Sequence, residues 1–302
     1  MAKRTFYQEM ARNRRNSLLL VVVVSLVLFG LIYTIGYIFA PDAIIVVIPV
    51  AVIIIVIYTW SSYQYGDQVV LSSVGAQPAE GPQYVYLRDT VEGLAIAAGV
   101  PPPKVYVMES PEINAFATGK DPEHASIAVT TGALRALNRQ ELEGVIAHEM
   151  SHVRNRDVEF MTLVAVLVGL ASILSHIIIR GLWFGGGRRR GRDREGGSGI
   201  EVIVLIFGII LAIIAPILVR LVQLAVSRSR EYLADSNGAE LTRYPEGLAS
   251  ALEKIEKGNQ GNMDVDEAVS HLFISDPHHS ALDAIWATHP PLEDRIKRLR
   301  EM

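Results

Sequence analysis

Four long apolar blocks constrain the fold of this chain more than any other feature of its sequence. The blocks cover residues 18–40, 43–60, 160–179 and 202–219. The first has about 23 residues and would be about 34 Å long as a helix, which is enough to cross the hydrocarbon core of a bilayer. Half of the residues are hydrophobic, and they concentrate in these blocks. We therefore predict a membrane protein that also carries a soluble portion.

The first two blocks are separated only by Pro41 and Asp42, so they predict a transmembrane hairpin. A secretory signal peptide is the competing interpretation, but the first block is too long for one and no small-residue cleavage site is obvious. Residues 1–16 are polar and basic, and positive charge tends to stay on the cytoplasmic side of a membrane. We expect the chain to return to the cytoplasm near residue 61.

The second pair of blocks encloses residues 180–199, a loop rich in glycine and arginine. Counting from a cytoplasmic N-terminus places this loop outside, which breaks the positive-inside preference. Either the pair spans the membrane regardless, or it packs partly against the soluble domain; we favour spanning. In both cases the number of crossings between residues 159 and 227 is even, so the two flanks lie on the same side.

The remaining segments have the composition of a soluble domain. Residues 87–98 predict an amphipathic helix, and short strands are predicted at 104–108, 114–118 and 126–130, between proline and glycine residues. The predicted fold class is α+β and mainly α, with a small sheet and up to four transmembrane helices. The predicted order is a transmembrane hairpin at 1–60, one half of a cytoplasmic domain at 61–159, a second hairpin at 160–226 and the other half at 227–302.

Charge and cysteine content exclude several classes of function. The formal net charge is −4, so no large basic surface points to nucleic acid. The chain has no cysteine, which rules out disulfides, cysteine-type zinc sites and thiol nucleophiles together. Any metal ion must therefore be bound by histidine and carboxylate side chains.

The run Ala-His-Glu-Met-Ser-His at 147–152 carries the strongest chemical signal of the chain. His148 and His152 are four residues apart, so on a helix both imidazoles lie on one face and can bind the same ion. Glu149 would lie beside that ion, where its carboxylate can take a proton from an activated water molecule. This pattern is typical of zinc hydrolases, provided that the segment is helical and a third ligand exists elsewhere.

The segment around this motif has the signature of a helix. Asn138 is a suitable N-cap, and Glu141 stands three residues later as its capping-box partner. Leu142, Val145 and Ile146 follow helical rather than alternating spacing. A histidine pair can also be an ordinary polar helix face, but the acidic residue between the histidines and the helical context favour a zinc site.

A third ligand is predicted after the fourth apolar block, in the run Glu-Tyr-Leu-Ala-Asp at 231–235. Glu231 and Asp235 are four residues apart, so on a helix their carboxylates share a face. One can bind the ion, and the other can accept the ring N–H of a histidine ligand and hold its orientation. Alone, such a pair would more often be a solvated acidic face. With the histidine motif on the same side of the membrane, the metal site is the favoured interpretation.

Several motifs agree in order with one known family. They are INAFATG at 113–119, TTGAL at 130–134, HEMSH at 148–152, EYLAD at 231–235 and THPPLEDR at 288–295. The chain resembles the HtpX family of membrane-bound zinc endopeptidases, which are related to the CAAX prenyl endopeptidases. The resemblance covers essentially the whole chain. It implies a thermolysin-like (gluzincin) core, one zinc ion per chain, and a multi-pass protein of the cytoplasmic membrane with a cytoplasmic catalytic domain.

The resemblance also implies a role for each matched position. The zinc ligands would be His148, His152 and Glu231, with Glu149 as the general base and Asp235 beside the ligands. Asn114, Ala115, Phe116 and Ala117 match an edge strand that binds the substrate backbone by strand addition. His289 and Arg295 match positions near the zinc that are thought to stabilise the oxyanion. From the residues alone, Pro290 and Pro291 could simply start a helix, and Arg295 could be solvated.

The position of the motif narrows the expected substrates. His152 lies eight residues before the third apolar block, about 12 Å along a helix. The zinc should therefore lie just above the cytoplasmic face of the bilayer. We expect the substrates to be membrane proteins cut in their cytosolic segments. The family resemblance implies that these are misfolded or damaged proteins, removed in membrane protein quality control.

Three other classes are weighed against this one. An intramembrane site-2-type protease would carry its motif within an apolar span, whereas this motif lies between polar segments. A membrane scaffold or chaperone with a structural zinc would usually offer four protein ligands, and three are apparent here. A CAAX-processing enzyme typically has more transmembrane helices. His176, His278 and His279 receive no predicted role, and the sequence predicts no oligomeric state.

Overall fold

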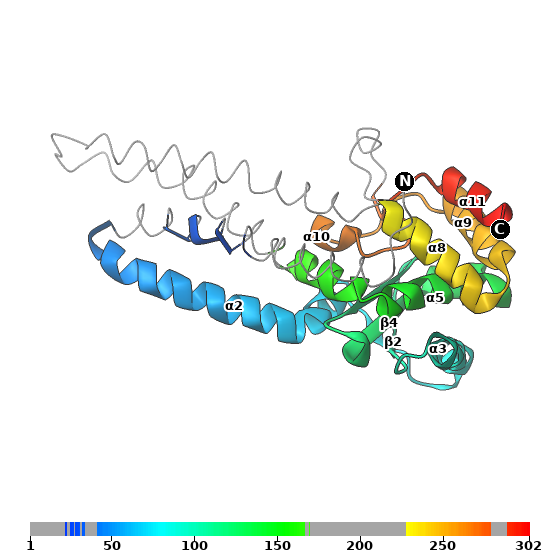
Figure 1. The fold of residues 1–302 in the computed structure, drawn as a ribbon, viewed down its shortest axis with the longest axis horizontal. Helices are drawn as coiled ribbons and strands as arrows, with labels where there is room; N and C mark the ends of the chain where they lie inside the picture. The colour runs from blue at the N-terminus through cyan, green and yellow to red at the C-terminus, as the bar shows by residue number, and fades with distance from the viewer. Residues whose placement is uncertain are drawn as a thin grey trace, which may run out of the picture. The chain divides into compact units, whose positions relative to one another are not determined.

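The computed structural model describes residues 41–166, 228–278 and 289–302, together with a few positions between 22 and 33 and position 169. Most of the first, third and fourth apolar blocks, the loop at 180–199, His176 and His279 lie outside these residues. The chain divides into two compact units. The first unit holds residues 1–14, 65–166 and 223–302, and the second holds residues 15–64 and 167–222. The sheet and every predicted site residue belong to the first unit. Figure 1 labels strands and helices along the chain.

The sheet of the first unit is small and mixed. Its strands are β1 (Gln77–Pro78), β2 (Lys104–Met108), β3 (Ala115–Gly119) and β4 (Ala125–Thr130), in the order β1-β2-β4-β3. Strands β2 and β4 are parallel, whereas β3 pairs with β4 antiparallel. The three predicted strands are confirmed, although β3 is shifted by one residue and β4 starts one residue earlier. β3 is therefore an edge strand of this four-stranded sheet.

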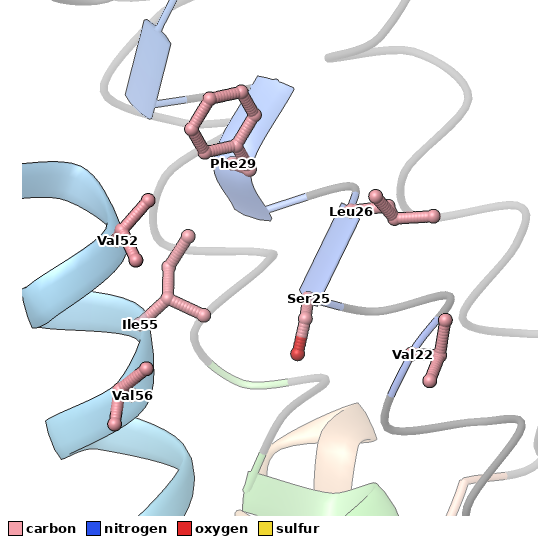
Figure 2. A pocket seen from close by; sticks show the side chains of 7 residues that line it. All are labelled: Val22, Ser25, Leu26, Phe29, Val52, Ile55 and Val56. Carbon is pink, nitrogen blue, oxygen red and sulfur yellow. The ribbon is translucent and has the colours of Figure 1, made fainter. Parts of the chain in front are cut away.

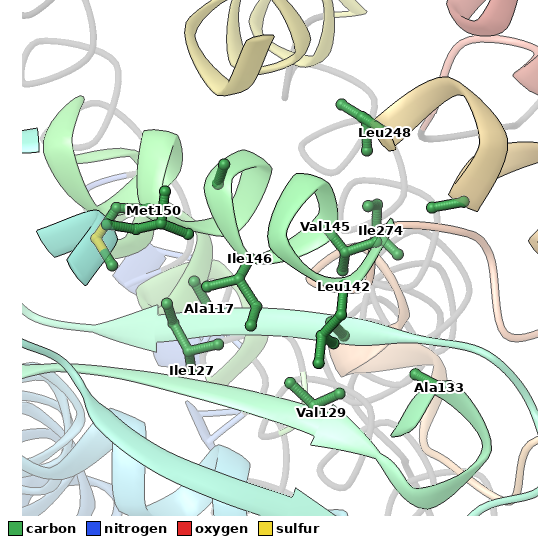
Figure 3. Packing of buried hydrophobic residues seen from close by; sticks show 14 of the residues in the cluster. Ala117, Ile127, Val129, Ala133, Leu142, Val145, Ile146, Met150, Leu248 and Ile274 are labelled. Atoms are coloured by element: carbon green, nitrogen blue, oxygen red, sulfur yellow. The ribbon is translucent and has the colours of Figure 1, made fainter. Parts of the chain in front are cut away.

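Helix α5 (Arg139–Arg154) lies on one face of this sheet and carries the predicted histidine motif. It begins with the predicted capping box: the Glu141 N–H donates to Asn138 Oδ1 over 3.0 Å, and the Asn138 N–H donates to Glu141 Oε2 over 2.7 Å. Figure 3 shows apolar side chains of α5 over those of the strands, namely Leu142, Ile146 and Met150 with Ala117, Ile127 and Val129. Burial of each large side chain contributes about 1.5–3 kcal/mol. This packing fixes the polar face of α5 away from the sheet.

The other helices of the first unit complete the core. They include α3 (Val85–Ala98), α4 (Thr131–Ala136), α8 (Arg228–Thr242), α9 (Pro245–Gly258), α10 (Glu267–Ser270) and α11 (Leu292–Arg300), and residues 157–166 are helical as well. Short 3-10 turns, η2 (Pro82–Tyr84) and η3 (Pro122–His124), lie between the longer elements. Helix α3 confirms the helix predicted at 87–98 and starts two residues earlier. Helix α8 confirms that Glu231 and Asp235 lie on one helix.

Two glycines allow α8 and α9 to approach α5 closely. A Cβ atom added to Gly144 of α5 would lie 2.6 Å from the backbone nitrogen of Leu248 in α9. One added to Gly238 of α8 would lie 3.1 Å from the backbone nitrogen of His148. An added side chain would clash at Gly144 and would make a tight contact at Gly238, so α8 lies directly against the part of α5 that carries the histidines.

We expect Gly144→Ala to lower the free energy of unfolding by about 1–3 kcal/mol, because the added methyl group overpacks the contact with the α9 backbone. Gly93→Ala in α3 is the matched control, since an added Cβ there meets nothing within 4 Å. Alanine should stabilise that helix by about 0.5–1 kcal/mol. Denaturant unfolding of both detergent-solubilised variants measures these changes. Wild-type stability of Gly144→Ala would contradict the close approach.

Among the described residues, one helix is long and apolar enough to cross a membrane. It is α2 (Ile44–Ser73), which follows the 3-10 turn η1 (Pro41–Ala43) and contains the candidate membrane span Ile48–Ser73. The sequence placed the end of the second apolar block at residue 60, but the helix continues to Ser73 and the chain first turns at Gly75, which has a φ of 66°. Ile45 is 82% exposed and Val56 62%. Apolar side chains exposed in this way suit a helix surrounded by lipid.

The second unit contains an apolar pocket of about 320 Å³ beside α2 (Figure 2). Val52 and Ile55 of α2 line it, together with Leu26 and Phe29 of the first apolar block. Ser25 is the one polar residue among those that line it. Since the lining holds no titratable side chain, this pocket offers no acid, base or metal ligand.

Candidate active site

Helix α5 places the three titratable residues of its motif inside the protein. His148 and Glu149 are each 1% exposed, and His152 is 3% exposed. The two histidine rings lie one helical turn apart with their centroids separated by 4.9 Å. The spacing predicted from the sequence is therefore realised, with both imidazoles on the same face of one helix.

Helix α8 brings Glu231 to these histidines, as the sequence predicted. Glu231 Oε2 lies 3.6 Å from His148 Nε2, and Glu231 Oε1 lies 3.5 Å from His152 Nε2. One donor atom from each of the three side chains lies within 4.8 Å of the other two. All three side chains are buried. The group has the size and the composition of a site for one metal ion.

Each histidine uses its other ring nitrogen to contact a carboxylate. His148 Nδ1 lies 3.0 Å from Asp235 Oδ1, one turn along α8 from Glu231. His152 Nδ1 lies 3.3 Å from Asp157 Oδ2. Such contacts fix the tautomer and the ring orientation of a metal-binding histidine. The Asp235 contact matches its predicted place, whereas Asp157 was missed by the sequence analysis.

Asp157 reaches the site through a turn at the end of α5. The helix ends at Arg154, and Arg156 has a φ of 60°, an uncommon value for a residue other than glycine. After this turn the chain is helical again from Asp157, whose carboxylate lies 3.3 Å from His152 Nδ1 and 3.6 Å from Nη1 of Arg230. The signal available in the sequence was an acidic residue five positions after the second histidine.

Helix α11 and the residues before it supply two more groups. Arg295 is completely buried and donates from Nε and Nη2 to the two carboxylate oxygens of Asp235, over 2.9 and 2.7 Å. Its Nη1 lies 3.5 Å from Glu231 Oε2. His289 Nδ1 lies 3.2 Å from the same oxygen. The interpretation of Arg295 as a solvated side chain is therefore wrong, because its planar guanidinium forms a two-point contact with a buried carboxylate.

The predicted substrate-binding residues lie at the outer edge of the sheet. Asn114 directly precedes β3, and the other three belong to it. This edge is not open in the structure: the Ile274 N–H donates to the Ala115 carbonyl over 2.9 Å, and Phe116 forms an antiparallel bridge with Phe273. His278 lies elsewhere, with its Nε2 3.1 Å from the Val265 carbonyl. It is not part of the group formed by His148, His152 and Glu231, which we call the metal-binding group.

Comparison with known families agrees with this arrangement. The model of the family described as peptidase family M48 matches residues 83–302, which include every site residue named above. The chain belongs to peptidase family M48. Since this is a family of metallopeptidases, the histidine and glutamate group is the expected place for its metal.

Full-length relatives extend the similarity of this M48 peptidase to its apolar segments. It is 49% identical over 302 residues to the protease HtpX homolog of Caldanaerobacter subterraneus subsp. tengcongensis, with 100% of this chain and 99% of that protein covered. It is 43% identical over 298 residues to the protease HtpX homolog of Dictyoglomus thermophilum, covering 99% and 95% of the two chains. The HtpX resemblance is therefore confirmed, and with helix α2 it makes the chain a membrane metalloprotease.

A solved structure shares the fold of this M48 peptidase at low sequence identity. The crystal structure of S. mikatae Ste24p matches with a TM-score of 0.50 and 19% identity. The match covers 97% of this chain and 66% of Ste24p. At this identity the similarity supports the mainly helical fold with a small mixed sheet.

Burial raises the pKa values of the carboxyl groups in this site, whereas neighbouring positive groups lower them. Burial raises the pKa of Glu149. Burial also acts to raise the pKa of Asp235, but Arg295 outweighs it and lowers that pKa to about 2. For Glu231, the neighbouring His289, His148 and Arg295 outweigh burial and hold the pKa well below its ordinary value. The carboxylates thus divide into two that stay ionised and one, Glu149, that holds a proton more readily, as a general base must.

The donor set fits a divalent metal ion. Both carboxylate oxygens of Glu149 are buried and have no hydrogen-bond partner in the described part of the chain. Burial lowers the pKa of His148, but its hydrogen bonds to Asp235 and Glu231 outweigh burial and raise it to about 9. A cation at this position would replace that proton, because histidine binds metals in its neutral form. Two imidazoles and one carboxylate match the ligands of catalytic zinc sites, which leave one position open.

Proposed function

We propose that this M48 peptidase is a zinc endopeptidase of the HtpX type, in which His148, His152 and Glu231 bind one zinc ion. The observation that carries the proposal is the convergence of these three buried side chains beside Glu149, whose own oxygens have no hydrogen-bond partner among the described residues. When bound, zinc would polarise the peptide carbonyl and make the attacking water more acidic. The core would be thermolysin-like.

The chain's own residues would move the protons of the reaction. Glu149 takes a proton from the attacking water on its carboxylate and passes it to the leaving amide nitrogen. Burial in the core raises the pKa of Glu149, which makes it a stronger base for the first of these transfers. Asp235 and Asp157 hold His148 and His152 in fixed orientations.

Two further residues would stabilise negative charge on the substrate. His289 lies 3.2 Å from Glu231, and neither of its buried ring nitrogens makes a hydrogen bond within the described residues. A protonated or N–H donating ring at this place can donate to the carbonyl oxygen as charge develops on it. Arg295 donates to Asp235 through Nε and Nη2 and to the Ile274 carbonyl through Nη1, so it would reach the substrate only through the remaining N–H of Nη1. Its other contacts hold Asp235 of helix α8 in place.

We further propose that the substrates are membrane proteins, misfolded or damaged, cut in cytosolic segments. The third apolar block starts eight residues after His152, and residues 157–166 are helical. Four membrane helices in two hairpins, with residues 61–159 and 227–302 forming one cytoplasmic domain, would hold the site at the membrane face. Substrates would bind as extended chains along β3, from Asn114 to Ala117.

Metal removal tests the zinc assignment. Purified protein is expected to contain about one zinc per chain, to lose casein cleavage on dialysis against a chelator, and to regain it with added zinc. His152→Ala should lose the metal. His124→Ala is the control, because Asp121, Glu123 and His124 form a second, exposed group that could hold an ion. Full zinc content in His152→Ala, or its loss in His124→Ala, would show that the site is misassigned.

Tethering tests the substrate class. One cleavable sequence is presented to the protein in liposomes, either as a free peptide or attached to a transmembrane anchor. Confinement to the membrane raises the effective concentration, so we expect the anchored form to be cut at least about tenfold faster. Equal rates for the two forms would count against membrane proteins as substrates and would leave the metal chemistry intact.

A further inference from the structure

Strand β3 has one edge on which a peptide could pair. In an antiparallel ladder, alternate residues direct their backbone groups to opposite sides. The Thr130 N–H donates to the Asn114 carbonyl over 3.0 Å, so Asn114, and Phe116 after it, face β4. Ala115, Ala117 and Gly119 therefore face outward. These outward backbone groups are the ones that strand addition by a substrate would use.

A short segment of the same chain already lies on this edge. We define the edge-covering segment as residues 271–275. The Ile274 N–H donates to the outward-facing Ala115 carbonyl over 2.9 Å, and the antiparallel bridge between Phe116 and Phe273 places the segment alongside β3. The two phenylalanine rings are in contact, with centroids 4.9 Å apart. The segment is therefore docked on β3 as a short extra strand would be.

The segment also uses the polar groups that a substrate would need. Asn114 Nδ2 donates to the Ser275 carbonyl over 3.0 Å, and the Ser275 N–H donates to Asn114 Oδ1 over 3.4 Å. Arg295 Nη1 donates to the Ile274 carbonyl over 3.0 Å, and this is the same nitrogen that lies 3.5 Å from Glu231. Ile274 thus contacts β3 through its N–H and the guanidinium of Arg295 through its carbonyl.

We propose that the edge-covering segment is an internal competitor for substrate, and that a peptide must displace it from β3 before it can be cleaved. The inference rests on the proposed peptidase function and concerns the regulation of that site. The segment makes an isolated bridge with β3 rather than a ladder, although its side chains are buried, with Phe273 and Ile274 each 1% exposed. Displacement would therefore break one short strand contact and would also expose these two side chains. If the segment is docked in about nine molecules of ten, the apparent affinity for peptide falls about tenfold.

A reversible covalent lock tests the proposal in the full-length protein. The chain has no cysteine, so Phe116→Cys combined with Phe273→Cys introduces the only two thiols. Bridged residues in antiparallel strands have the Cα separation that a disulfide requires. Side chains alternate between the faces of a strand, and the neighbours Ala115 and Ala117 pack in the core with α5, so the disulfide would lie on the other face of the sheet.

The expected result is a loss of at least about tenfold in kcat/KM for casein peptides on oxidation, restored by reduction. The comparison is made within one protein, so any effect of the substitutions themselves cancels. The two single-cysteine variants are controls for the oxidant and should not change. Equal kcat/KM in the oxidised and reduced forms, with the disulfide verified by mass spectrometry, would overturn the proposal.

Hydrogen exchange gives a second test that leaves both phenylalanines in place. Glu149→Gln protein is incubated with and without saturating casein peptide. Displacement predicts that amides in residues 272–275 exchange faster with peptide bound, while amides of α9 do not change. Unchanged or slower exchange in 272–275 would refute displacement. Failure of the peptidase function itself would differ from both outcomes, because wild-type protein would then show no metal-dependent cleavage.

Discussion

Glu149→Gln is expected to lower kcat for peptide cleavage by about 10²–10⁴-fold while the protein keeps its zinc. Glutamine has nearly the same shape as glutamate but cannot accept a proton from water. The Glu149 side chain is 1% exposed and makes no hydrogen bond to a described residue, so its replacement removes no structural contact of the described site. Peptide cleavage and zinc content of the purified variant, measured side by side, check both halves of this expectation.

Glu143→Gln is the matched control for that experiment. Glu143 lies on the same helix two residues after Glu141, outside the metal-binding group, and the substitution makes the same chemical change. Its activity should remain that of the wild type. Cleavage by purified Glu149→Gln at the wild-type rate would remove Glu149 from the mechanism. Loss of zinc together with activity would instead mean that the residue supports the metal site.

Arg295→Met is expected to lower the free energy of unfolding by about 3–5 kcal/mol, because it leaves a buried carboxylate without its partner. Arg295 is 0% exposed and forms a two-point contact with Asp235, which is 2% exposed. It also donates to the Ile274 carbonyl, which would lose this hydrogen bond. Denaturant unfolding in detergent, monitored by tryptophan fluorescence, measures the change.

Two variants complete the Arg295 experiment. Lys297→Met on the same helix replaces an exposed cation and should change stability by less than about 0.5 kcal/mol. Arg295→Met combined with Asp235→Leu removes both charges and should recover part of the lost stability. Metal binding should remain weak in the double variant, because Asp235 also orients His148. A single Arg295→Met variant as stable as the wild type would show that the buried pair is not needed for the fold.

The sequence by itself determined the parts of the structure that depend on local spacing. The capping box of Asn138 and Glu141, the helical face of His148 and His152, and the three short strands were all predicted to within one residue. Glu231 was also found from the sequence, because its acidic partner four residues later marked a helix face. These features involve neighbours along the chain, where helix and strand periods restrict which side chains can meet.

Only the tertiary structure decided the contacts between distant segments. Asp157 was missed because its position depends on the turn at Arg156. The residues alone did not distinguish a buried Arg295 from a solvated one, because its partner Asp235 is 60 residues away. The cover of β3 by residues 271–275 pairs positions more than 150 residues apart. Such pairings cannot be predicted from the spacing of residues along the chain. They form because packing excludes water, so each buried polar group needs a hydrogen-bond partner within the protein. The sequence therefore predicted that His148, His152 and Glu231 come together. The packing of the surrounding helices decided how these side chains are oriented and whether the outer edge of β3 is covered.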